Sequence, residues 1–249
     1  MSSPLLDIAG LSRRFRGLVA VDAVSFAVQP AAIHGLIGPN GAGKTTCFNL
    51  VSGLVAADAG TITLAGTRLE PLPVHARTRA GLARTFQNIR LFAEMSVLEN
   101  TLCGQHTRRL AERAAKAQAL ELLDLVGLAA RAGERAGALA YGDQRRLEIA
   151  RALASAPKLL LLDEPAAGMN PAESEALALL LQQLRAGGTT LLLVEHDMGF
   201  VMRLCDRITV LNFGRVIAEG SPRDIRADPG VIEAYLGPAL ARRLGPVDP

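Results

Sequence analysis

Residues 38–46 read Gly-Pro-Asn-Gly-Ala-Gly-Lys-Thr-Thr, which is the spacing of a phosphate-binding loop. The glycines let the backbone curl, so that successive N–H groups point inward at a polyphosphate. Lys44 adds a positive charge for the β- and γ-phosphates, and Thr45 offers a hydroxyl to Mg²⁺. The apolar run at 32–37 predicts a strand before the loop, and a helix is expected at 45–51, whose N-terminus favours anions. The predicted ligands of the polyphosphate are Gly38, Pro39, Asn40, Gly41, Ala42, Gly43, Lys44, Thr45 and Thr46.

A second chemical motif follows the leucine run at 159–162, where Asp163 and Glu164 stand side by side. Four consecutive leucines predict a strand buried on both faces, with Asp163 emerging at its end. A carboxylate there can hold Mg²⁺ directly or through water, and Glu164 can orient or deprotonate an attacking water. Base assistance of this kind is worth about 10² to 10⁴ in rate. The two motifs together indicate hydrolysis of a nucleoside triphosphate.

These motifs need a scaffold that brings several strand ends together. A helix is expected at residues 172–185. Strands that alternate with helices favour an α/β fold with a largely parallel sheet and right-handed crossovers. Apolar runs predict further strands at residues 5–11, 23–28, 60–64, 189–194 and 207–212.

The middle of the chain, residues 96–155, loses β-branched residues and gains Ala, Leu and Arg at helical spacing. One apolar helix face is predicted there, with Arg113, Lys116 and Glu121 outside it. We therefore expect a helical segment inserted between two parts of the α/β fold. The predicted face contains Leu110, Ala114, Ala117, Leu120, Leu123 and Leu125.

The composition narrows the kind of protein. The chain has 249 residues and is 49% hydrophobic, enough for a large buried core. Aromatic residues make up 4% and Trp is absent, so an aromatic platform for nucleic-acid bases is not expected. Cys47, Cys103 and Cys205 lack metal-ligand spacing, so neither a metal site nor a disulfide framework is predicted, and a reducing compartment is favoured. A net charge of +3 fits work near an anionic membrane face, but no signal peptide or membrane-spanning run is expected.

Two further motifs extend the phosphate loop and the carboxylate pair into a family pattern. Residues 84–88 read Arg-Thr-Phe-Gln-Asn, and residues 193–198 read Leu-Val-Glu-His-Asp-Met. Together the four motifs resemble the ATP-binding subunits of ABC transporters over almost the whole chain. The resemblance implies the ABC ATPase form of the P-loop NTPase fold, with a mostly parallel core sheet, N-terminal antiparallel strands and an inserted helical subdomain. It implies a nucleotide-binding core at 1–95 and 156–225, a helical subdomain at 96–155, and a C-terminal helix and tail at 226–249.

The resemblance also implies roles for single residues. In this family a glutamine loop senses the γ-phosphate and touches the membrane partner, and Gln87 stands at that position. A histidine after a late strand contacts the γ-phosphate, here His196, and an upstream aromatic residue stacks on adenine, here Phe15. ATP and Mg²⁺ are the implied cofactors. The implied catalytic residues are Lys44, Glu164 and His196, and the implied Mg²⁺ ligands are Thr45, Gln87 and Asp163.

One loop departs from the family pattern. ABC ATPases work as head-to-tail dimers, and each ATP lies between the phosphate loop of one chain and the signature loop of the other, commonly Leu-Ser-Gly-Gly-Gln. The matching residues here are Ala140, Tyr141, Gly142 and Asp143. Ala140 lacks the hydroxyl that would bond the γ-phosphate, and Asp143 replaces a neutral amide, either for function or as a favourable acid in a first helical turn. If the partner is a different chain, we expect the ATP site that receives this loop to be the weaker of two.

Several of these variations resemble one branch of the family. The branch is the first of the two ATP-binding subunits of high-affinity branched-chain amino acid importers. It implies a distinct second ATP-binding subunit, with a homodimer as the alternative, two membrane permeases and, indirectly, a periplasmic substrate-binding protein, but no nucleic acid. The implied location is the cytoplasmic face of the bacterial inner membrane, as a peripheral protein. The resemblance rests on the Ala-Tyr-Gly signature, on the Glu-His-Asp-Met motif, and on residues 86–92, 166–171 (with Asn170 where Asp is usual) and 231–237.

The mechanism implied by the family is alternating access driven by closure and reopening of the ATPase dimer. The Gln87 loop and residues 97–128 are expected to form the groove that grips the cytoplasmic helices of the permeases. Related importers of urea, short amides or other amino acids remain alternatives, because the substrate never touches this chain. A lipopolysaccharide-export ATPase is disfavoured by Ala140, and an ABC ATPase acting on DNA or ribosomes by the lack of a second nucleotide domain or long insertions. A small kinase or GTPase is disfavoured by the signature helix and His196.

Overall fold

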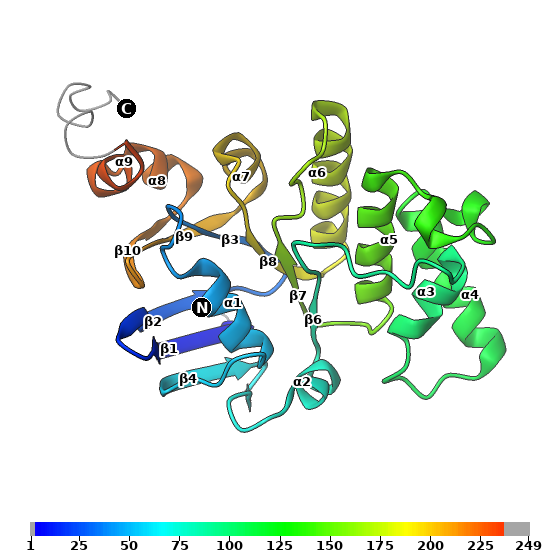
Figure 1. Ribbon diagram of the computed structural model, residues 1–249, viewed down its shortest axis with the longest axis horizontal. Helices are drawn as coiled ribbons and strands as arrows, with labels where there is room; N and C mark the ends of the chain where they lie inside the picture. Colours follow the sequence, from blue (N-terminus) through cyan, green and yellow to red (C-terminus); the bar gives the residue numbers. More distant parts are fainter. Residues whose placement is uncertain (1–2, 237–249) are drawn as a thin grey trace.

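The computed structural model describes residues 3–236, which form two sheets flanked by helices (Figure 1). The smaller sheet is antiparallel and has the strand order β2-β1-β4-β5. Its strands come from the first part of the chain, so the expectation of N-terminal antiparallel strands is confirmed. Their bounds are β1 Leu6–Phe15, β2 Leu18–Val28, β4 Ala59–Leu64 and β5 Thr67–Arg68.

The larger sheet has the strand order β10-β9-β3-β8-β7-β6 and is parallel except for the final β9–β10 hairpin. Every residue of β3, β7 and β8 is buried, because both faces of the sheet are covered. The prediction of an α/β fold with a mostly parallel core sheet is confirmed. The bounds are β3 Ile33–Ile37, β6 Leu82–Arg84, β7 Leu159–Asp163, β8 Thr190–Val194, β9 Arg207–Asn212 and β10 Arg215–Gly220.

Side chains that alternate along the central strands build two separate cores. On β7, Leu160 and Leu162 enter one hydrophobic cluster, whereas Leu159 and Leu161 enter the other. This alternation is the period of two expected for a strand. The first cluster joins the sheet to the helical segment, and the second joins it to the antiparallel sheet and α1. The phosphate loop and the carboxylate pair therefore emerge from a sheet that is packed on both sides.

Local sequence signals explain where the helices begin. The longest, α6, begins with Pro171 and has a capping box in which Asn170 and Glu173 each accept the other's backbone N–H. None of the helices within residues 3–236 combines the length and the apolar character that a membrane span requires. The helices that flank the sheets are α1 Lys44–Ser52, α2 Val74–Ala80, α6 Pro171–Ala186, α7 Met198–Leu204, α8 Pro222–Ala227 and α9 Pro229–Leu236.

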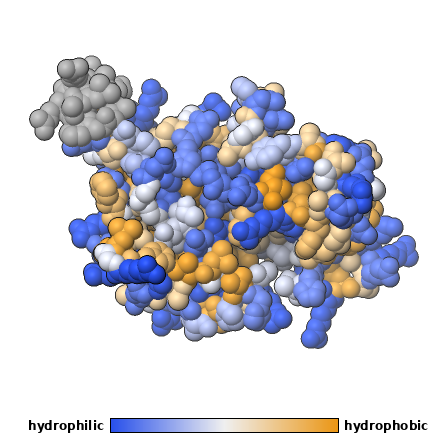
Figure 2. Space-filling view, viewed as in Figure 1, coloured by the Kyte–Doolittle hydropathy of each residue, from blue (hydrophilic) through white to orange (hydrophobic). Residues whose placement is uncertain are grey.

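Three helices, α3 Val97–Gly104, α4 Glu112–Leu125 and α5 Tyr141–Leu153, lie together at one end of the molecule (Figure 1). The same view in Figure 2 shows apolar side chains gathered over α5. Two short 3₁₀ turns, Ala129–Arg131 and Ala136–Ala138, connect α4 to α5. Of the predicted C-terminal helix and tail at 226–249, residues 237–249 lie outside the described residues.

The predicted apolar face of α4 is wrong for three of its residues and right for two: Leu123 is buried, and Leu125 is partly buried and packs against the core. Ala114, Ala117 and Leu120 are exposed, whereas Ala119 and Leu123 are the buried residues of the helix. Leu110 precedes the helix, which begins at Glu112. Alanines occur on every side of this helix, so the composition does not specify a face. The phase is set instead by packing against α3 and α5, which local periodicity does not report.

Candidate functional site

The phosphate loop connects β3 to α1, as its sequence predicted. A side chain at Gly38 would place its Cβ 2.1 Å from the carbonyl oxygen of Leu211, and one at Gly43 would place it 2.4 Å from that of Ala20. Both glycines also have positive φ angles, of 150° and 102°. Only glycine therefore fits at these positions, and the loop keeps an open cradle of backbone N–H groups at the start of the helix.

Lys44, the first residue of α1, turns back across the loop. Its Nζ donates hydrogen bonds to the carbonyl oxygens of Gly38 at 2.7 Å and Pro39 at 3.0 Å. Burial lowers the pKa of Lys44 from its ordinary value, although the nearby carboxylate of Glu164 opposes the shift. The ammonium group is therefore held at the mouth of the cradle, where a bound phosphate would supply further acceptors.

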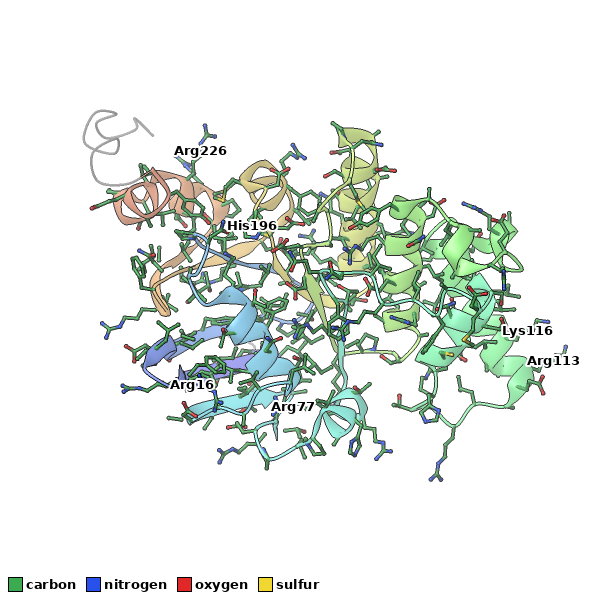
Figure 3. All side chains as sticks on the ribbon, in the orientation of Figure 1. Arg16, Arg77, Arg113, Lys116, His196 and Arg226 are labelled. Atoms are coloured by element: carbon green, nitrogen blue, oxygen red, sulfur yellow. The ribbon has the colours of Figure 1, made fainter. Side chains whose placement is uncertain are left out.

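Two residues that lie far from Glu164 in the sequence converge on its carboxylate. Glu164 Oε1 lies 2.6 Å from His196 Nε2, and Glu164 Oε2 accepts a hydrogen bond from Gln87 Nε2 at 2.9 Å. Glu164 has a φ of 48°, and its backbone N–H bonds to the carbonyl of Val194 at 2.9 Å. This left-handed turn directs its side chain toward the loop that follows β8. Figure 3 shows His196 near the middle of the molecule, between α7 and α1 in that view.

The residues expected to hold Mg²⁺ offer the hard oxygen donors that this cation prefers. Thr45 is exposed at the start of α1. The amide nitrogen of Gln87 donates to Glu164, which leaves the amide oxygen of Gln87 available as a ligand. Asp163 is buried, and its Oδ2 accepts a hydrogen bond from Arg84 at 2.7 Å. Its Oδ1 has no hydrogen-bond partner within the described part of the chain. The donor set fits a cation shared between the protein and a phosphate chain.

An open cleft of about 850 Å³ brings most of these residues to one surface. The cleft is lined by the phosphate loop from Asn40 to Thr46, by Gln87, Glu164 and His196, and by Phe15, which is 41% exposed. Asp163 is not among its lining residues and lies deeper, at the end of β7. The guanidinium of Arg13 lies 4.9 Å from the ring centroid of Phe15. Sequence reasoning missed the apolar lining residues Leu18, Val19, Ala20 and Phe213.

Glu195 is a buried carboxylate to which the motif at residues 193–198 assigned no role. Its Oε1 accepts the N–H of Ala166 at 2.7 Å, and its Oε2 accepts the N–H of His196 at 3.0 Å. Burial raises the pKa of Glu195, and the charge of Glu164 adds to that shift. Glu195 thus joins the loop after Glu164 to the loop that carries His196. The sequence signal that could have identified Glu195 is its position directly after the uninterrupted apolar run at 191–194.

The family model described as ABC transporter matches residues 21–167, more than half of the 249-residue chain. The chain belongs to the ABC transporter family. As an ABC ATPase it binds and hydrolyses ATP. A second model, described as branched-chain amino acid ATP-binding cassette transporter, matches residues 215–237.

Individual relatives resemble this ABC ATPase over nearly its full length. It is 48% identical to the high-affinity branched-chain amino acid transport ATP-binding protein LivG of Escherichia coli (strain K12), across 96% of this chain and 100% of LivG. It is 46% identical to the corresponding protein BraF of Pseudomonas aeruginosa, with the same coverage. The crystal structure of the ADP conformation of MJ1267, an ATP-binding cassette of an ABC transporter, superposes with a TM-score of 0.86 at 29% identity, covering 95% of this chain and 100% of MJ1267.

The signature loop of this ABC ATPase is not part of its own nucleotide cleft. Ala140 is the N-cap residue of α5 and makes no side-chain capping bond, and none of the residues 140–143 lines the cleft. Asp143 accepts hydrogen bonds from Arg131, at 2.5 Å, and from Arg146. Its carboxylate therefore fastens the first turn of α5 to the 3₁₀ turn Ala129–Arg131, which gives an acidic residue at this position a structural role.

Tyr141 and Gly142 complete the loop in different ways. Tyr141 is exposed, whereas Gly142 is buried and would place a Cβ 3.0 Å from the carboxylate of Glu173 on α6. The backbone at this helix start remains free of a side-chain cap, so N–H groups are available to an anion from another chain.

Proposed function

We propose that this chain is the ATP-hydrolysing subunit of an ABC importer for branched-chain amino acids. The observation that carries the proposal is the full-length match to LivG and BraF, together with the branched-chain family model at residues 215–237. These matches do not favour lipopolysaccharide export or a non-transport ABC ATPase. Because substrate specificity belongs to other subunits, the named substrate is tested by transport rather than by this chain alone.

The contacts of Glu164 support a role as the base for the attacking water. Gln87 and His196 each contact one of its two oxygens, so its orientation in the cleft is set before ATP binds. Lys44 and His196 are placed to bind the γ-phosphate, and the N–H groups of the loop bind the phosphate chain. Mg²⁺, when bound through Thr45, Asp163 and Gln87, supplies positive charge that offsets charge on the phosphates. Phe15 is placed to stack on the adenine ring.

The position of the signature loop supports the proposal of a second ATP-binding subunit. Residues 140–143 lie outside the cleft that holds the phosphate loop, so a head-to-tail partner is needed to bring such a loop to each ATP. We infer a heterodimer with a distinct second subunit, and a homodimer is the alternative outcome of the purification described below.

A groove beside the Gln87 loop suits the permease partners. It measures about 550 Å³ and is lined by residues of β6, α3 and α5, such as Arg84 and Arg151, and by residues of the loops next to α3, such as Phe92 and His106. Phe92 is exposed at 53%, and an apolar ring in a groove with charged walls suits an amphipathic helix end. We infer that each of the two permeases docks in such a groove of one ATPase subunit at the cytoplasmic face of the bacterial inner membrane. A periplasmic substrate-binding protein acts on the other side of the permeases.

The test is purification of the tagged chain from membranes, identification of bound subunits by mass spectrometry, and uptake of labelled leucine by proteoliposomes containing the complex. The proposal expects two permeases, a second ATPase and ATP-dependent leucine uptake that excess isoleucine and valine suppress. Suppression by urea or short amides, with none by valine, would assign a related importer. Recovery of the chain without permeases would contradict a transport role.

A further inference from the structure

Arg84, the last residue of β6, packs its side chain against Asp163, although it has no assigned role in the motif at residues 84–88. Its Nη2 donates to Asp163 Oδ2 at 2.7 Å, and the two side chains are 7% and 5% exposed. Taking such a pair out of water is costly, and apolar residues of similar size often give equal or better stability. A contribution to folding is therefore a weak explanation for an arginine at this position.

The same guanidinium also holds the helix that follows the phosphate loop. Its Nη1 donates to Asn49 Oδ1 at 2.7 Å and to Ser52 Oγ at 2.8 Å, both on α1. It lies 5.7 Å from the ring centroid of Phe48 and 5.2 Å from that of Phe86. Because the guanidinium is planar and rigid, these contacts fix the direction in which it meets the carboxylate of Asp163.

We propose that Arg84 is a positioning residue that orients Asp163 for Mg²⁺. The proposal rests on the role of Asp163 as a magnesium ligand, given above. Arg84 occupies Oδ2, and Oδ1 is left without a protein partner in residues 3–236, so Oδ1 is the oxygen that would be available to the cation or its water. Arg84 also stands three residues before Gln87, so one side chain connects the carboxylate, α1 and the start of the glutamine loop.

The test measures how nucleotide binding depends on Mg²⁺, which needs no turnover. A fluorescent ADP analogue is titrated against the wild type, Arg84→Met and Arg84→Lys at a series of Mg²⁺ concentrations and in EDTA. We expect Arg84→Met to raise the Mg²⁺ concentration for half-maximal enhancement of binding by roughly 10-fold or more, as loss of such supporting partners commonly does. Arg84→Lys keeps the charge but loses the rigid fork, so a smaller shift is expected. Binding in EDTA should stay at the wild-type level.

Arg77→Met is the matched control. Arg77 lies on α2 (Figure 3) and is 4% exposed. Its Nη1 donates to the carbonyls of Leu50 at 2.6 Å and Val51 at 2.8 Å on the same helix α1, with no bond to Asp163. If Arg84 merely supports α1, both methionine variants will lose thermal stability and keep the wild-type Mg²⁺ dependence, which overturns the proposal.

Asp163→Asn separates this inference from the function on which it rests. A lost Mg²⁺ dependence in Asp163→Asn beside a wild-type dependence in the Arg84 variants overturns the positioning role alone. A wild-type dependence in Asp163→Asn overturns both assignments. If Arg84→Met does not fold, Arg84→Lys decides the question, because an unshifted Mg²⁺ dependence in that variant contradicts the need for a rigid fork.

Discussion

At the scale of single residues, Glu164 is the group on which turnover should depend most. Glu164→Gln keeps the size of the side chain and can still bond to Gln87 or His196, but it removes the base that activates water. We expect ATP turnover to fall by roughly 10² to 10⁴. Nucleotide affinity should be retained, because the phosphate loop and Lys44 are unchanged. Phosphate release and titration with a fluorescent nucleotide measure the two quantities separately.

Glu175→Gln is the control for that variant. Glu175 lies on α6, is 61% exposed, and makes only a long ion pair, of 3.8 Å, with Arg203. The variant should therefore leave both turnover and nucleotide affinity unchanged. A Glu164→Gln protein that turns over ATP at the wild-type rate, or that no longer binds nucleotide, would contradict the assigned role.

Phe15 tests the assignment of the adenine end of the cleft. Phe15→Ala removes the ring but leaves the phosphate contacts, so we expect nucleotide affinity to fall by roughly 2- to 12-fold, from a stacking contribution of about 0.5–1.5 kcal/mol. The rate at saturating ATP should change little. Leu18→Ala, an exposed apolar truncation in the same cleft, is the comparison. Equal losses in the two variants would mean that the ring has no special role.

At the scale of the elements, Glu195 connects the loops that follow β7 and β8. Glu195→Gln keeps one acceptor oxygen but turns an amide nitrogen toward a second backbone N–H, that of Ala166 or His196. Leaving a buried donor without a partner costs about 1–3 kcal/mol. Urea denaturation should therefore show a lower free energy of unfolding for the variant, and Glu175→Gln should not share this loss.

The difference in free energy of unfolding between wild type and Glu195→Gln should also depend on pH. Because burial raises the pKa of Glu195 above its ordinary value of 4.5, the folded protein holds this proton more tightly than the unfolded chain. The carboxyl group thus contributes most to stability below the unfolded value, and that contribution declines as pH rises through the folded one. The stability difference between wild type and Glu195→Gln should narrow as pH rises from about 4.5 toward neutrality. A difference that widens with pH would contradict the raised pKa.

The elements differ in how far the sequence could predict them. The central strands were readable because their apolar runs are buried on both faces, so composition alone marks them. The buried face of α4 could not be predicted in the same way, because it is set by packing against α3 and α5. Arg84 and Glu195 stand within the quoted motifs but were assigned no role, for a related reason: Arg84 meets a carboxylate 79 positions away, and Glu195 meets a loop 29 positions away. Gln87 and His196 were named by family resemblance and Glu164 by its place after a buried strand, and only the fold shows that the three side chains meet.

At the scale of the whole molecule, a single chain carries two unlike contributions to ATP sites. Its cleft presents Lys44, Glu164 and His196 together, so the site built on its own phosphate loop is well supplied. Its signature loop offers Ala140 without a hydroxyl, and Asp143 is engaged by two arginines. In a heterodimer, the partner's phosphate loop receives this poorer loop. The two sites should then differ in how much transport depends on them.

This difference can be measured by disabling one site at a time in the assembled importer. Glu164→Gln in this chain removes the base from the better-completed site, so we expect it to reduce leucine uptake by proteoliposomes more than the equivalent change in the second subunit. Ala140→Ser restores the missing hydroxyl and should raise the ATP turnover that remains when Glu164→Gln is present, because that turnover comes from the partner's site. Equal losses of uptake from the two base variants, with no gain from Ala140→Ser, would show that Ala140 leaves the sites equivalent.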